Sequence, residues 1–168
     1  ELARSEAWLR ARQARLCDER LAEMYDLNLF FCIFFSTGVT LDTEEFVLVT
    51  SRSPRYYVSA AYWDRDSLLW AFPAVLDADA ALARDMLIYA FTRQARNFGV
   101  HSRYIDGTVL EPGFELDELA APILALERYI EATDDRGLLD EPAIRAGAER
   151  VLSGLRAAYY PALGLYET

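Results

Sequence analysis

Two aspartates in this sequence stand at the starts of apolar segments with helical spacing, each three residues after an aromatic side chain. Asp66 follows Trp63, and Asp117 follows Phe114. A carboxylate at a helix N-terminus faces unpaired backbone N–H groups and the positive end of the helix dipole, so we expect both carboxylates to stay ionised. Such groups bind sugar hydroxyls, and aromatic rings cover sugar C–H faces. The two starts therefore predict a polyol pocket, provided that they share one end of the fold.

A purely structural interpretation of these charges stays open at this point. The helix dipole alone favours an acidic residue in the first turn by about 0.3 to 1 kcal/mol. Arg65, which lies between Asp64 and Asp66, is equally a local ion pair or a ligand contact. The ligand interpretation gains weight because aromatic residues, which have little structural purpose if exposed, gather at the same two starts: Tyr62, Trp63 and Phe114.

The only histidine, His101, lies between Gly99 and the turn dipeptide Asp106-Gly107. No serine or cysteine partner accompanies it in a recognisable motif, so a hydrogen-bonding role is expected rather than triad chemistry. Neither of the two cysteines has a second Cys or a His at metal-ligand spacing. Gly-rich phosphate loops are also absent, and no metal or other cofactor is expected.

The segments that must position these side chains are mostly helical. Apolar residues recur at helical spacing, and capping or breaking residues bound each run. Tyr56 and Tyr57 are expected to pack internally before the second helix. The expected helices are residues 2–27, 63–76, 80–98, 116–132 and 142–159, and the expected β-hairpins join 29–35 to 46–50 and 102–105 to 108–110.

The four later helices pair into two hairpins, each about 50 residues long, with a helix out and a helix back. Such a repeat is typical of a helical solenoid or a closed helical toroid. In either architecture, the first and more apolar helix of each pair lies inside, so both acidic starts would share one mouth. The expected fold class is therefore mainly α, with one or two small β-hairpins.

Composition limits the partners of this chain. The 168 residues carry a formal net charge of −10, which argues against nucleic acid and anionic membrane surfaces. The longest apolar run, residues 29–35, is far shorter than the ~20 residues of a membrane-spanning helix. No signal peptide is recognisable, which favours a cytoplasmic location, but the chain begins at Glu1 rather than Met and looks like a piece of a longer protein, so the sequence leaves targeting open.

Two stretches of this chain resemble a known enzyme family. Residues 60–67, Ala-Ala-Tyr-Trp-Asp-Arg-Asp-Ser, resemble the Trp-x-Arg-Asp-Ser stretch of the six-hairpin, (α/α)6-toroid glycoside hydrolases. These include glucoamylases, glycogen-debranching and processing glucosidases, and metal-independent α-mannosidases. Residues 114–119, Phe-Glu-Leu-Asp-Glu-Leu, followed by Pro122, look most like the Glu-Leu-Asp-Ser-Leu stretch of the α-mannosidase branch. The resemblance covers residues 57–130, with weaker support in 164–168.

The resemblance implies that residues 1–168 form part of a toroid, truncated at the C-terminal end. It implies a parent protein that is an inverting exo-acting α-glycosidase, in which Arg65 and Asp66 hold the terminal sugar. Glu167 is the only candidate in the chain for the general acid, and the alternative is a donor just past Thr168. The general base lies outside the chain, so the isolated chain should be inactive. The residues expected to bind substrate are Tyr62, Trp63, Arg65, Asp66, His101, Phe114, Glu115 and Asp117.

A second function remains open on sequence grounds, namely a non-catalytic helical repeat that binds carbohydrate or protein. A half-ring would also expose the apolar faces of its inner helices, which predicts self-association or association with the missing half. Mannose and glucose differ in the direction of one hydroxyl group, so the sequence does not choose between them.

Overall fold

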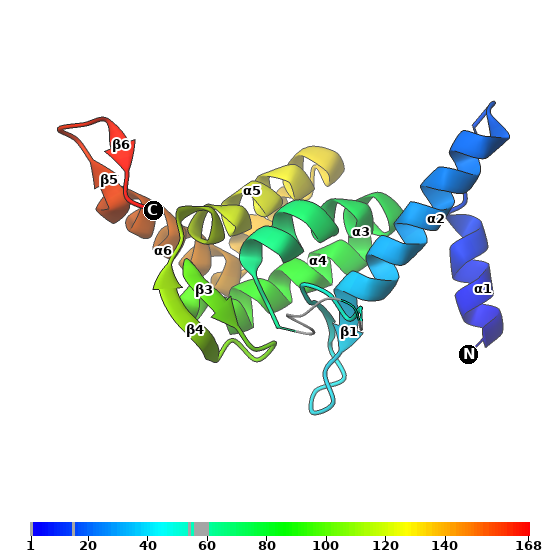
Figure 1. Ribbon diagram of the computed structural model, residues 1–168, viewed down its shortest axis with the longest axis horizontal. Helices are drawn as coiled ribbons and strands as arrows, with labels where there is room; N and C mark the ends of the chain where they lie inside the picture. The colour runs from blue at the N-terminus through cyan, green and yellow to red at the C-terminus, as the bar shows by residue number, and fades with distance from the viewer. Residues whose placement is uncertain (1, 15, 54, 56–60) are drawn as a thin grey trace.

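The computed structural model describes residues 2–14, 16–53, 55 and 61–168, and it is mainly helical with small antiparallel β-hairpins (Figure 1). Tyr56 and Tyr57 lie outside the described residues. The helices are α1 (Leu2–Ala11), α2 (Glu19–Ser36), α3 (Phe72–Ala78), α4 (Ala80–Tyr89), α5 (Leu116–Thr133) and α6 (Pro142–Ala158). Shorter helical stretches are η1 (Arg65–Ala71), η2 (Ala90–Gln94), η3 (Ala95–Asn97) and η4 (Arg136–Asp140), and the strands are β1 (Thr37–Val39), β2 (Phe46–Leu48), β3 (Val100–Arg103), β4 (Val109–Phe114), β5 (Tyr159–Tyr160) and β6 (Leu165–Tyr166).

The expectation of one helix over residues 2–27 was wrong, because the chain forms two helices there. α1 ends at Ala11, and α2 begins at Glu19. Asp18 caps the second helix, since its side chain accepts hydrogen bonds from the backbone N–H groups of Arg20 and Leu21. Such a capping aspartate starts a new helix at the point where the apolar pattern alone suggested continuity.

The expected strand over residues 29–35 was also wrong, since these residues form the last turns of α2. Short apolar runs are compatible with either a strand or a helix, and periodicity alone does not separate them. The helix places aromatic rings four residues apart on one face: Phe30 stacks on Phe34 with ring centroids 5.6 Å apart, and Phe31 stacks on Phe35. The hairpin in this region is formed instead by β1 and β2, with Gly38 opposite Val47.

The two later helix hairpins are confirmed. η1 and α3 together run from Arg65 to Ala78, and α4, η2 and η3 carry the chain back to Asn97. α5 packs against η1 and α3, α4 packs against α3 and α5, and α6 packs against α5 and η2. The buried core lies between these helices and includes Leu68, Phe72, Leu87, Ala125 and Ile144. The first helices of the two hairpins are therefore neighbours.

The predicted hairpin around Asp106-Gly107 is confirmed as β3 and β4, which pair antiparallel. Gly107 has φ +86°, and a Cβ atom there would lie 2.1 Å from the carbonyl oxygen of Arg93. Only glycine fits such a position without a backbone shift. The hairpin is thus fixed against η2, and it places β3 beside the start of η1 through backbone hydrogen bonds between Tyr62 and Arg103.

In the part of the chain that the structure describes, no helix is long and apolar enough to cross a membrane.

Candidate functional site

The two acidic helix starts lie together, and Arg65 joins them. Its Nε lies 3.5 Å from Asp66 Oδ2, in the first turn of η1, and its Nη1 lies 2.9 Å from Asp117 Oδ2, in the first turn of α5. The same guanidinium lies 3.0 Å from Glu115 Oε2 and 3.6 Å from Glu118 Oε1. We call these five residues, Arg65, Asp66, Glu115, Asp117 and Glu118, the Arg65 cluster. The sequence-based expectation that both starts share one end of the bundle is therefore confirmed.

Arg65 keeps the Asp117 carboxyl group ionised. Partial burial acts to raise the pKa of this carboxyl group, but the hydrogen bond and the positive charge of Arg65 outweigh burial and keep the pKa below its ordinary value. The side chains of Arg65 and Asp117 are 32% and 49% exposed, so both remain open to a ligand. The cluster can therefore offer a hydroxyl group both a charged donor and a charged acceptor.

His101 has the hydrogen-bonding role expected from the sequence. Its Nδ1 lies 2.7 Å from Glu115 Oε1, and its Nε2 lies 3.4 Å from Glu111 Oε2. The imidazole ring packs edge-on to the Trp63 ring, with centroids 5.7 Å apart. His101 thus links β3 to the start of α5 and fixes one side of the Arg65 cluster through Glu115.

A buried charged layer lies beneath the cluster, and it was not predicted from the sequence. The side chains of Asp64, Arg103 and Glu118 are fully buried. Arg103 donates to the Asp64 carboxylate and, through Nη1, to the carbonyl oxygen of Asn97 at 2.5 Å. Its Nη2 also lies 3.9 Å from Glu118 Oε2. This layer holds the start of η1, β3 and the start of α5 against one another.

The two buried carboxyl groups of this layer titrate differently from ordinary ones. Burial raises the pKa of Asp64 to about 6, although Arg103 opposes the shift. Burial, together with the negative charge of Asp64, raises the pKa of Glu118 to about 8. The shifts favour the protonated form of Glu118 at neutral pH, whereas Asp64 is mostly ionised and paired with Arg103.

Two of the expected aromatic sugar contacts are corrected by the structure. Tyr62 is 1% exposed and Trp63 is 7% exposed, so neither ring offers an open face for a sugar. The physical reason is their position beside β3: the Tyr62 backbone pairs with Arg103, and Trp63 packs on His101. Phe114, at the other start, is 44% exposed and keeps an open ring.

An open cavity of about 420 Å³ lies beside Asp66. Its other walls carry hydroxyl groups and a guanidinium, which are suitable partners for a polyol. They belong to Thr50, Ser51, Ser53 and Arg55. Sequence reasoning missed these residues, since nothing in their spacing connects them with the helix starts.

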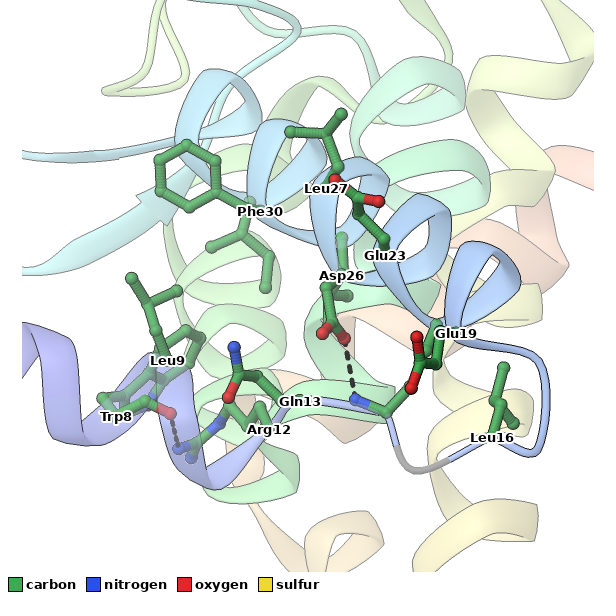
Figure 2. Close-up of a pocket in the computed structure, with 14 residues that line it drawn as sticks. Trp8, Leu9, Arg12, Gln13, Leu16, Glu19, Glu23, Asp26, Leu27 and Phe30 are labelled. Atoms are coloured by element: carbon green, nitrogen blue, oxygen red, sulfur yellow. Dashed lines mark hydrogen bonds between the residues drawn. The ribbon is translucent and has the colours of Figure 1, made fainter.

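A second cavity, of about 670 Å³, lies between α1 and α2 and contains none of the expected site residues (Figure 2). It is lined by apolar side chains, including Trp8, Leu9 and Phe30, and by carboxylates of α2 such as Glu19 and Glu23. Figure 2 shows Asp26 of α2 bonded to the backbone of the loop that follows α1. Aromatic and aliphatic residues form much of this lining, whereas the residues around the cavity beside Asp66 are all polar or charged.

Glu167, the expected candidate for the general acid, lies just after β6 and is exposed. Its backbone N–H donates to the carbonyl oxygen of Ala158 at 2.8 Å. Among the described residues, its side chain forms no ion pair or hydrogen bond with the Arg65 cluster. The structure also places no group of three or more His, Cys, Asp and Glu side chains, within the residues it describes, where they could hold a metal ion.

Asp64, Arg103 and Glu118 have only weak signals in the sequence. Asp64 belongs to the same short motif as Arg65, and Glu118 follows Asp117 directly. The alternation of strand β3 could have indicated that Arg103 points inward, but its partner at the start of η1 is distant in the sequence.

Comparisons with protein-family models, curated proteins and solved structures find no match for this chain.

Proposed function

We propose that the Arg65 cluster and the cavity beside Asp66 form the binding subsite for a terminal hexose, within a toroidal α-glycosidase of which this chain is a part. The observation that carries the proposal is that one guanidinium contacts Asp66 from one helix start and Asp117 from the other. Such a fork of alternating donors and acceptors suits adjacent hydroxyl groups of a sugar.

Other features support the same proposal. The resemblance in residues 60–67 and 114–119 assigns sugar contacts to Arg65, Asp66 and Asp117, and these residues come together in space. Phe114, which directly precedes Glu115 in the sequence, has an exposed ring, and the cavity beside Asp66 is lined by hydroxyl groups. The parent reaction would be inverting hydrolysis, which needs two carboxyl groups about 6.5 to 9.5 Å apart with a water between them.

A titration of the isolated chain with methyl α-D-mannopyranoside and methyl α-D-glucopyranoside tests this proposal. In protein-observed NMR we expect saturable shifts at Arg65, Asp66 and Phe114, with a Kd on the order of 1 to 10 mM. Asp117→Asn should weaken binding roughly tenfold, because it removes a charged acceptor. Asp134→Asn is the matched control, since Asp134 is exposed at the other end of α5. Equal effects of the two substitutions, or no saturable shifts at the cluster, would contradict the proposal.

A second candidate function is a non-catalytic helical module that binds another protein. The observation that favours it is the apolar cavity between α1 and α2, whose lining includes Trp8, Leu9 and Phe30 (Figure 2). Absence of sugar-induced shifts at the Arg65 cluster would remove the first candidate and leave the second.

A further inference from the structure

Unpartnered buried polar atoms gather beneath the Arg65 cluster. Among the described residues, the buried side-chain atoms without a hydrogen-bond partner include Glu118 Oε1, Asp64 Oδ1 and the Tyr62 hydroxyl. The three side chains are each 1% exposed or less. Buried polar groups are normally paired, so such a group of exceptions points to a proton, water or other species at that place.

Positive charge at this place is not sufficient to neutralise both buried carboxyl groups. Arg103 is committed to Asp64, and its Nη2 is 3.9 Å from Glu118 Oε2. Arg65 lies 3.6 Å from Glu118 Oε1. It forms shorter ion pairs with the more exposed carboxylates of its cluster: Asp66, Glu115 and Asp117. An ionised Glu118 would thus be a buried charge without a cation of its own, which is costly.

We propose that Glu118 is a positioning residue that holds a proton and, in this neutral form, leaves the Arg65 guanidinium free to serve Asp117 and a sugar hydroxyl. The inference rests on the proposed function of the Arg65 cluster. Glu118 Oε2 accepts a hydrogen bond from the Arg65 backbone N–H at 3.3 Å. This leaves Oε1, which has no hydrogen-bond partner among the described residues, as the oxygen to which we assign the proton. Its raised pKa, about 8, agrees with a proton held at neutral pH.

The groups facing Glu118 determine how the site responds when the proton leaves. They are Tyr62 and Asp64 before η1, Arg65 at its start, and Arg103 on β3. Asp64 repels the new charge, and the two guanidinium groups attract it. Arg65 would be drawn inward, away from Asp117 and the ligand, because it is the less buried of the two and is shared with exposed carboxylates. Sugar affinity should therefore fall as pH rises through the range in which Glu118 ionises.

The proton and the sugar are then linked, so each must affect the other equally. Affinity for methyl α-D-mannopyranoside should fall about fivefold or more between about pH 6 and about pH 9. Bound sugar should, in turn, raise the pH at which the Glu118 carboxyl carbon titrates. Glu118→Gln, which is permanently neutral and nearly the same shape, should keep the acid-pH affinity across the whole range.

The experiment is an NMR pH titration of wild-type chain and Glu118→Gln, which follows the Glu118 carboxyl carbon, the Arg65 Nε resonance and sugar affinity. His101 is retained in both proteins, so the difference between their profiles belongs to Glu118. We expect Arg65 Nε to shift with the same midpoint as Glu118 in wild type and not in Glu118→Gln. Titration of Glu118 in the ordinary glutamate range, or an unchanged Arg65 profile in Glu118→Gln, would overturn the inference. Absence of sugar binding in both proteins would instead refute the proposed function, while the two resonances still decide whether Glu118 positions Arg65.

Discussion

Two parts of this chain differ in how far their side chains are buried. In the body, residues 61–158, even charged side chains such as Asp64, Arg103 and Glu118 are fully buried and face opposite charges. In the arm, made of α1 and α2, no residue of either helix is buried, although α2 is rich in phenylalanine. Phe31 and Phe34 are 45% and 47% exposed. The body therefore buries most of its core within itself, whereas the arm leaves apolar surface open and packs on that core only through half-buried side chains such as Cys32 and Ile33.

Polar contacts at one turn hold α1 of the arm to the body. Asp79 caps α4 by accepting a hydrogen bond from the Leu82 backbone N–H. Its other carboxylate oxygen accepts hydrogen bonds from the side chains of Trp8 and Arg12. Arg12 also donates to the carbonyl oxygen of Ala78. A few hydrogen bonds with little apolar burial stabilise weakly, so we expect α1 to open at far lower free energy than the body.

The largest expected effect concerns the buried charges of the body. Arg103→Met leaves Asp64 and Glu118 without their shared cation and should lower the free energy of unfolding by about 3 to 5 kcal/mol. Arg145→Met is the matched control, because Arg145 forms an exposed ion pair with Asp140 and should cost about 0 to 1 kcal/mol. Urea unfolding measures both. Similar costs for the two variants would show that the buried layer does not stabilise the body.

A second comparison makes the same side-chain change in the body and in the arm. Leu87 on α4 is 0% exposed, and Leu27 on α2 is 52% exposed. Leu87→Ala should lower the free energy of unfolding by about 2 to 5 kcal/mol, through lost burial and a residual cavity, whereas Leu27→Ala should cost under about 1 kcal/mol. If urea unfolding shows that Leu27→Ala costs as much as Leu87→Ala, the arm is covered in solution.

The smallest expected effect is local release of α1. Partial burial acts to raise the pKa of Asp79, but hydrogen bonds from Leu82, Trp8 and Arg12 outweigh it and hold the pKa below its ordinary value. Because the folded-state pKa is lowered, the stabilising contribution of Asp79 is present above the ordinary pKa of an aspartate. It is lost as pH falls through the folded-state pKa. Acid should therefore detach α1 at a pH where the body remains folded.

Asp79→Ala should reproduce this detachment at neutral pH, at a cost of about 1 kcal/mol. The Trp8 indole N–H, which donates to Asp79, reports it by its NMR shift and hydrogen exchange. Asp85→Ala, at an exposed position of the same helix, is the control. Unchanged protection of the Trp8 indole in Asp79→Ala would contradict the contact on which the arm depends.

The sequence predicted the body better than the arm, for physical reasons. Helix starts, turn residues and caps such as Gly99 and Pro142 are local signals, so the two later hairpins and the β3–β4 turn were confirmed. The arm carries the ambiguous apolar run of residues 29–35, whose state depends on the helix that precedes it. There the local pattern favoured a strand, and continuation of α2 prevailed.

The sequence predicted best those residues of the candidate site that are charged and stand at a helix start. Arg65, Asp66 and Asp117 lie at helix starts, and the sequence showed that these starts could meet. Burial of Tyr62 and Trp63 depends on strand β3, which is distant in the sequence, so both were expected to be exposed. The same long-range pairing buries Arg103 and Glu118, so neither was predicted from the sequence.

The central claim is that both helix starts contact one sugar, and intermolecular NOEs test it most directly. With the chain saturated by methyl α-D-mannopyranoside, isotope-filtered spectra should show NOEs from the same sugar to the Phe114 ring and to the Arg65 side chain. Such a pair of NOEs requires that the starts of η1 and α5 form one site. NOEs to only one of the two starts, or only to Trp8 and Phe30 in the arm, would contradict the account.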